Sequence, residues 1–203
     1  MNFKKLCLSL SVAIGLHAGV VLAADLTPDA LVRTTTQDVL AVVKQDKAIQ
    51  AGDNKKILAL VDEKVLPHFD FGKMTRLAVG GDWRKASPEQ QEALVREFRT
   101  LLVRTYSTAL TGFKDQTVEV KPARLSSEND ALVQSRINQP SGKPLAIDYK
   151  MGKGSKGWQV YDVTIDGISL VTSYRGDFGA KIQQGGIDGL LKSLAEKNRA
   201  GKK

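Results

Sequence analysis

Few side chains in this 203-residue sequence could act as nucleophiles, bases or metal ligands. The single cysteine, Cys7, and one of the two histidines, His17, lie within the first 23 residues, so His68 is the one histidine of the remaining chain. A structural zinc site needs about four Cys or His ligands, and a catalytic site about three protein ligands. No Ser-x-x-Lys or nucleophile-elbow pattern occurs. The sequence therefore predicts a protein that is not an enzyme and holds no metal or cofactor.

Apolar side chains are abundant and recur in three stripes. Two stripes have helical spacing and one has the alternation of a strand; they are Leu94, Phe98, Leu101 and Leu102, then Leu170, Tyr174, Phe178 and Ile182, and Leu145, Ile147, Tyr149 and Met151. Such stripes fit either an ordinary packed core or a core that encloses an apolar guest, because both need the same residues.

The N-terminus has the layout of a secretory signal. Lys4 and Lys5 precede an uncharged run from Leu6 to Leu22, and Ala23 provides a small residue for cleavage. An uncleaved anchor is the alternative, although about 17 apolar residues are at the lower limit for a membrane span. Cleavage after residue 23 would leave 180 of the 203 residues and lower the formal charge from +8 to +6, since both lysines are removed.

Helices are predicted for the first half of the chain. The sequence Thr27-Pro28-Asp29 is a typical helix start, Asp53 caps a second helix that Pro67 ends, and Ser87 to Gln90 form a capping box. We expect the helix that follows this box to reach about Leu110 and to stop near Gly112.

The second half alternates with a period of two over four segments, near residues 118–120, 132–137, 145–151 and 158–165. In the last segment, strict alternation puts Trp158 and Val160 opposite Tyr161, Val163 and Ile165. Two helices separated by Gly185-Gly186 should follow, and residues 197–203 should form a basic disordered tail. The predicted class is α+β: one domain over residues 24–196, with helices packed on a curled antiparallel four-stranded sheet and a cleft between the layers.

The basic net charge fits acidic partners or membrane headgroups, or simply a soluble surface. Nucleic acid is disfavoured, because the basic residues are scattered and no aromatic platform accompanies them.

Taken together, the ordered motifs resemble the MlaC family, also called the toluene-tolerance family, over about Leu31 to Leu194. The motifs that carry the resemblance are Leu66-Pro67-His68-Phe69-Asp70-Phe71, the run from Gly80 to Gln91, Thr105-Tyr106, Ile147-Asp148-Tyr149, Trp158 to Val163, Asp166 to Val171, Tyr174-Arg175 and Gly186 to Leu190.

The resemblance implies a periplasmic phospholipid carrier that maintains outer-membrane lipid asymmetry, with an NTF2-like fold and acyl chains held between its layers. Its implied partners are phospholipid as cargo, an outer-membrane lipoprotein–porin complex and the substrate-binding subunit of an inner-membrane ABC transporter. A monomer without catalytic activity is expected. Ser169 and Asp162 fall in matched motifs, and we interpret them as framework at the junction of strand and helix.

The candidate pocket residues are the apolar and aromatic side chains expected to face inward. They are Phe71, Leu77, Val79, Phe98, Leu102, Tyr106, Ile137, Ile147, Tyr149, Met151, Val163, Ile165, Leu170, Tyr174 and Phe178. One alternative is an NTF2-like enzyme acting on a small apolar substrate, which would need acid–base groups such as Asp70, Tyr106 and Asp148 in the cleft. Another is a periplasmic chaperone or ligand-binding adaptor that exposes its apolar groove.

Overall fold

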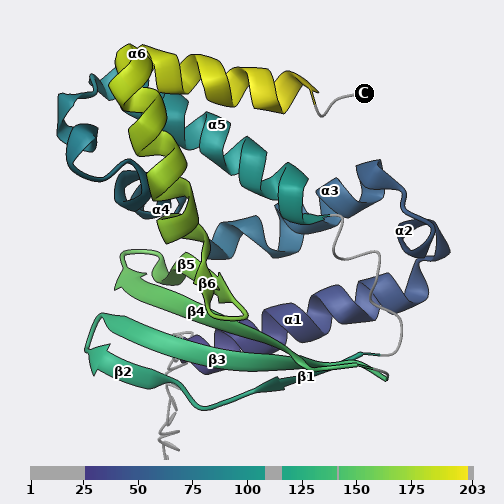
Figure 1. Ribbon diagram of the computed structural model, residues 1–203. Helices are drawn as coiled ribbons and strands as arrows, with labels where there is room; N and C mark the ends of the chain where they lie inside the picture. Colours follow the sequence, from purple (N-terminus) through teal and green to yellow (C-terminus); the bar gives the residue numbers. More distant parts are fainter. Residues whose placement is uncertain (1–25, 108–115, 141, 201–203) are drawn as a thin grey trace, which may run out of the picture.

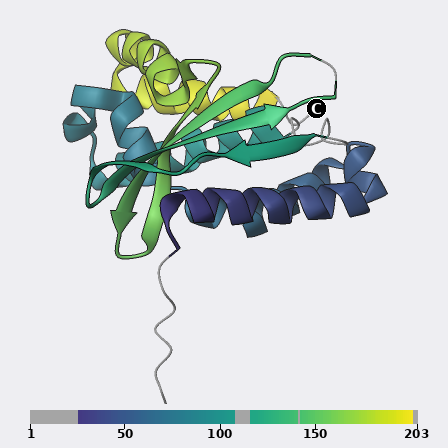
Figure 2. The ribbon, with the colours of Figure 1, turned by 90° about the horizontal axis from the view of Figure 1, so that it is seen from below.

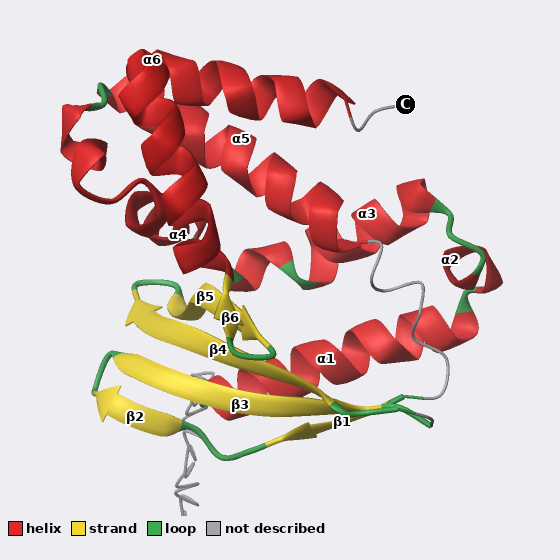
Figure 3. Cartoon of the chain, viewed as in Figure 1, coloured by secondary structure: helices red, strands yellow, loops and turns green. Residues whose placement is uncertain are grey.

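The computed structural model describes residues 26–107, 116–140 and 142–200. The predicted signal segment, the predicted helix stop near Gly112 and residues 201–203 of the predicted tail lie outside the described residues. Within them the strands form one layer and the helices gather mainly on one side of it (Figure 3). The predicted α+β class is confirmed.

Helices α1 and α3 begin where the capping residues predict, whereas the short helix α2 between them was not predicted. Helix α1 spans Pro28–Gln45, α2 spans Lys47–Gln50 and α3 spans Asn54–Lys64. The side chain of Asp46 accepts a hydrogen bond from the backbone N–H of Ala48 at 2.8 Å, and that of Asp53 accepts from Lys55 at 3.0 Å. These caps satisfy backbone donors that the first turn leaves unpaired.

A short 3₁₀ turn, η1 (Leu66–His68), follows α3 at the predicted proline stop. Helix α4 spans Phe71–Val79, the 3₁₀ segment η2 spans Gly80–Lys85 and α5 spans Pro88–Tyr106. Ser87 and Gln90 form the predicted capping box at the start of α5. The chain thus changes direction at η1 and at η2, and α5 then runs above the sheet (Figure 1).

In the described part of the chain the sheet has six strands rather than the four predicted. They are β1 (Thr117–Val120), β2 (Arg124–Ser127), β3 (Asp130–Asn138), β4 (Leu145–Gly154), β5 (Gly157–Ile165) and β6 (Ile168–Ser169). Strands β2 and β6 were not predicted. Strand β2 is exposed at every position and so lacks an alternating apolar pattern, and β6 has only two residues. All strand pairs are antiparallel, in the order β1-β3-β4-β5-β6 with β2 also paired to β3. Among the described residues β1 and β6 stand at opposite ends of this order, so the sheet is open. The curl that was predicted for it is not found.

A β-bulge in β5 corrects the predicted faces of that strand. Lys150 pairs with Asp162, whereas the next residue, Met151, pairs with Val160, so Tyr161 is the additional residue. The bulge shifts the alternation by one, and Trp158, Val160 and Val163 therefore share one hydrophobic cluster. The prediction that they lie on opposite faces was wrong.

The long helix α6 (Leu170–Ala200) is kinked where the glycine pair predicted a break. Gly185 and Gly186 leave helical geometry, and Gly186 has a φ of 66°, a conformation that glycine adopts readily. The helix continues to Ala200, past residue 197 where the disordered tail was expected to begin, and there Lys197 pairs with Asp177 at 2.9 Å and Asn198 is buried. Among the helices of the described residues, none has the length and hydrophobicity needed to cross a bilayer.

At the start of α6, Asp162 and Ser169 join strand to helix. The Asp162 carboxylate accepts from the Ser169 hydroxyl at 2.8 Å and from the Val171 backbone N–H at 3.2 Å. The framework role expected for both residues is confirmed.

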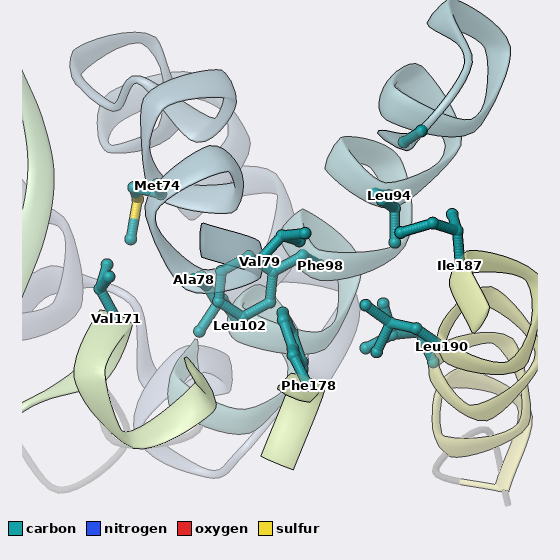
Figure 4. Packing of buried hydrophobic residues seen from close by; sticks show 12 residues of the cluster. Met74, Ala78, Val79, Leu94, Phe98, Leu102, Val171, Phe178, Ile187 and Leu190 are labelled. Atoms are coloured by element: carbon teal, nitrogen blue, oxygen red, sulfur yellow. The ribbon is translucent and has the colours of Figure 1, made fainter. Parts of the chain in front are cut away.

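The buried apolar residues among those described form three hydrophobic clusters. One joins α4, α5 and α6 around the fully buried rings of Phe98 and Phe178, whose centres are 5.0 Å apart (Figure 4). A second joins the inner face of the sheet to α1, which runs alongside the strands (Figure 2). The third joins α1, α2 and α3. Because the clusters are separate, space can remain where they meet.

Candidate functional site

A cavity of about 350 Å³ lies between the sheet and the helices, in the described part of the chain. Helices α1, α3, α4 and α5, the turn η1, the first residue of α6 and strands β1, β3, β4 and β5 all contribute to its wall. Its volume is within the usual range of small-molecule sites, roughly 300–1,000 Å³. The predicted cleft between the layers therefore has a counterpart in the structure.

The sheet wall of the cavity is made of cross-strand pairs. Leu145 pairs with Ile137, Ile147 pairs with Ile165, and Tyr149 pairs with Val163. All six line the cavity, because alternate residues of a strand point to the same face. Two residues beyond Tyr149, the bulge brings Val160 beside Met151, which extends the same apolar wall.

The helical wall follows from spacing of three and four residues. Val32, Thr35, Thr36 and Val39 of α1 lie along one face, and Val61 of α3 is four residues before the C-cap residue of that helix, Val65. On α5, the stripe that reaches the cavity comprises Leu102, Val103 and Tyr106. These helices thus supply mostly aliphatic groups opposite the strand pairs.

No Asp, Glu, Lys or Arg is among the described residues that line the cavity. The polar groups of the wall are Thr35, Thr36, His68, Tyr106, Ser107 and Tyr149.

The titratable groups of the wall stay neutral near pH 7. Burial lowers the pKa of the His68 imidazole from its ordinary value of 6.5. Burial raises the pKa of the Tyr149 phenol, and a hydrogen bond with Ser135 opposes the rise only in part. It also raises the pKa of Tyr106, next to Tyr174. The wall therefore suits an uncharged, apolar guest.

The structure brings ten of the predicted pocket residues together around the cavity: Phe71, Leu102, Tyr106, Ile137, Ile147, Tyr149, Met151, Val163, Ile165 and Leu170. It places the other five, Leu77, Val79, Phe98, Tyr174 and Phe178, in the cluster between α4, α5 and α6. The sequence shows which face of a helix is apolar, but not whether a neighbouring helix or an open space covers that face.

Seventeen further residues line the cavity and were not predicted as site residues. They are Leu31, Val32, Thr35, Thr36, Val39, Leu40, Val61, Val65, Leu66, His68, Phe69, Met74, Val103, Ser107, Val118, Leu145 and Val160. The apolar stripe of α1 is visible in the sequence and could have suggested a wall. Nothing in the sequence shows that α1 lies along the sheet.

The three residues considered for acid–base chemistry are not brought together in the cavity. Asp70 caps α4 by accepting from the Lys73 backbone N–H at 2.8 Å, and Asp148 accepts from Gln134 at 3.3 Å. Of the three residues considered for acid–base chemistry, Tyr106 alone lines the cavity. The described residues also contain no group of three or more His, Cys, Asp or Glu side chains suited to a metal ion.

Fold and site together define a small α+β binding protein with an apolar interior cavity. The family described as MlaC protein matches residues 33–196, which is most of the sequence. The chain belongs to the MlaC family, as the sequence motifs predicted.

Named relatives agree with this assignment. The chain is 22% identical over 177 residues to the Haemophilus influenzae intermembrane phospholipid transport system binding protein MlaC, covering 85% of this chain and 83% of the relative. It is 24% identical over 163 residues to the Pseudomonas putida toluene tolerance protein ttg2D, covering 80% of this chain and 76% of the relative.

A solved structure also resembles the protein closely. It is the phospholipid-binding protein from Ralstonia solanacearum in complex with a phospholipid, with a TM-score of 0.80 and 40% sequence identity. The match covers 86% of this chain and 98% of the Ralstonia chain.

Proposed function

We propose that this protein is a periplasmic phospholipid carrier that encloses acyl chains in the cavity between its sheet and helices. The observation that carries the proposal is the cavity wall, which is mostly aliphatic and aromatic and has no charged side chain among its described residues. The phospholipid bound to the similar Ralstonia protein supports the choice of guest.

The energetics of such a guest require enclosure. Exposing acyl chains to water costs about 0.8 kcal/mol per methylene, so two ordinary chains cost on the order of 20 kcal/mol. A mobile protein must therefore offer an interior nearly as apolar as the bilayer. Because the bilayer and the cavity are similarly apolar surroundings for acyl chains, moving a lipid from one to the other changes its free energy little. The carrier therefore gains little net driving force by extracting lipid.

The direction of transport then depends on docked partners or an energised transporter. The partners we infer are an outer-membrane lipoprotein–porin complex and the substrate-binding subunit of an inner-membrane ABC transporter. The Haemophilus relative, named as part of an intermembrane phospholipid transport system, supports such an assembly. Maintenance of outer-membrane lipid asymmetry is the role that such a shuttle would serve.

Residence in the periplasm is part of the same proposal. The support comes from the sequence of the first 23 residues, with its charged start, apolar run and small-residue exit.

A transfer assay between two vesicle populations tests the carrier function. Donor vesicles contain a fluorescent phospholipid. A porous filter, which lets protein through but retains vesicles, separates them from the acceptor vesicles. We expect the protein to move label to the acceptors at a rate proportional to its concentration. Transfer no faster than in buffer would contradict the proposal.

A further inference from the structure

Arg99 occupies the turn of α5 that precedes the cavity-lining stripe. It is three residues before Leu102, four before Val103 and seven before Tyr106, all of which line the cavity. Residues at these separations share one face of a helix. The side chain of Arg99 therefore lies at the rim of the cavity, in line with its wall.

The guanidinium of Arg99 has two neighbours at this rim. Its central carbon lies 5.8 Å from the centre of the Phe71 ring, and Phe71 lines the cavity. Its Nη2 atom lies 2.9 Å from Oδ1 of Asp62 on α3. Asp62 follows Val61, which also lines the cavity, so the ion pair joins α3 to α5 beside the apolar wall.

The ion pair is weakly held. The side chains of Arg99 and Asp62 are 48% and 60% exposed. Exposed pairs of this kind contribute little to stability, because water screens the charges and two side chains must be ordered. A second anion at the rim could therefore replace Asp62 with little loss.

A phospholipid loaded into the cavity would supply such an anion. Its acyl chains fit the neutral interior, whereas its phosphate must stay at the rim because a buried unpaired charge is costly. The planar guanidinium can donate two parallel hydrogen bonds to phosphate oxygens. We propose that Arg99 is a headgroup-binding residue, which exchanges the Asp62 carboxylate for the lipid phosphate on loading. The inference rests on the proposed function and adds a charged subsite to it.

Substitutions at the pair test the exchange against two lipids with the same acyl chains. One is phosphatidylglycerol, which has the phosphate, and the other is diacylglycerol, which lacks it; both are delivered from cyclodextrin. We expect Arg99→Gln to weaken phosphatidylglycerol binding on the order of tenfold, the loss of one charge-assisted contact, and to leave diacylglycerol unchanged. Asp62→Asn should strengthen phosphatidylglycerol binding a few-fold, because the competing carboxylate is removed.

Two further variants test whether the effect is specific to the guanidinium of Arg99. Arg96→Gln is the matched control, since Arg96 lies on the same helix, is 68% exposed and pairs with Glu92 at 3.7 Å. It should bind both lipids as the unchanged protein does. Arg99→Lys retains the charge without the planar fork and should fall between the unchanged protein and Arg99→Gln.

Defined results would overturn the proposal. If Arg99→Gln weakens the binding of both lipids equally, Arg99 supports the cavity wall and does not bind the phosphate. If it weakens the binding of neither lipid, Arg99 does not contact the headgroup. Competition by millimolar inorganic phosphate against phosphatidylglycerol would assign the site to free phosphate instead. If the unchanged protein binds neither lipid, the proposed function itself is wrong, and the vesicle assay should then show no transfer above buffer.

Discussion

Tyr149 of β4 and Val163 of β5 lie directly opposite each other, and both side chains face the cavity. Just beyond this pair, the bulge at Tyr161 shifts the register, so that Val160 joins the same wall. Without the bulge, β5 would turn Val160 away from the cavity. The apolar wall thus depends on a local irregularity of one strand as well as on its composition.

Leu102→Gln should lower the amount of co-purified lipid several-fold. Leu102 is 6% exposed and lines the cavity, so the amide would be placed among aliphatic groups without an assured partner. Leu132→Gln is the control, since Leu132 pairs with Lys150 on the sheet face that points away from the cavity. Phosphate analysis of extracted lipid measures the effect; equal lipid in both folded variants would remove Leu102 from the binding wall.

Phe178→Ala and Ile147→Ala should separate core packing from lipid binding. Phe178 is fully buried between α5 and α6, so its removal should lower the free energy of unfolding by about 3–5 kcal/mol and leave the cavity wall in place. Ile147 is half-buried and faces the cavity, so Ile147→Ala should destabilise less but retain less lipid. Urea unfolding and lipid analysis of both variants check this, and the reverse pattern would contradict it.

Asp162→Ala should lower the free energy of unfolding by about 2–3 kcal/mol. The Asp162 carboxylate is 3% exposed and accepts hydrogen bonds from Ser169 and Val171, which its loss would leave unpaired. Asp148→Ala should change stability by no more than about 0.5 kcal/mol, because Asp148 makes one long hydrogen bond on the outer face. Similar losses in the two variants would show that Asp162 is not the anchor of α6.

Tyr161 should make the fold sensitive to alkali. Burial, with the nearby Asp130 carboxylate, raises the pKa of the Tyr161 phenol to about 12 from an ordinary value of 10.0. Its folded pKa is the higher one, so its contribution to stability is complete below pH 10 and is lost as the pH rises toward 12.

Unfolding measured at pH 9 and pH 11.5 should therefore show a larger loss in the unchanged protein than in Tyr161→Phe. Other groups titrate in the same interval, and the comparison of the two proteins removes their effect. Identical losses would mean that the pKa of Tyr161 is not raised in the folded state.

Much of the helical framework could be predicted from the sequence because its signals are local. Asp53, Ser87 and the Gly185-Gly186 pair mark helix boundaries through their own hydrogen bonds or backbone freedom. The β5 bulge and the pairing of β2 depend on partner strands, so the period-two pattern alone could not reveal them.

The site was predicted best on the sheet. Ile147, Tyr149 and Met151 lie on one strand, and a strand has only two faces to choose between. Phe98 and Phe178 looked equally suitable, but the packing of α5 on α6 covers them. The α1 wall, with Thr35 and Val39, depends on contacts between segments far apart in the sequence.

Native mass spectrometry of the purified protein tests the central claim most directly. The protein is kept free of detergent, its mass is recorded intact, and the released ligand is identified after solvent extraction. We expect the intact mass to exceed that of the polypeptide by whole phospholipid molecules, with Leu102→Gln largely empty and Leu132→Gln loaded. A polypeptide without phospholipid, or equal loading of the two variants, would contradict the proposal that the cavity between sheet and helices carries lipid.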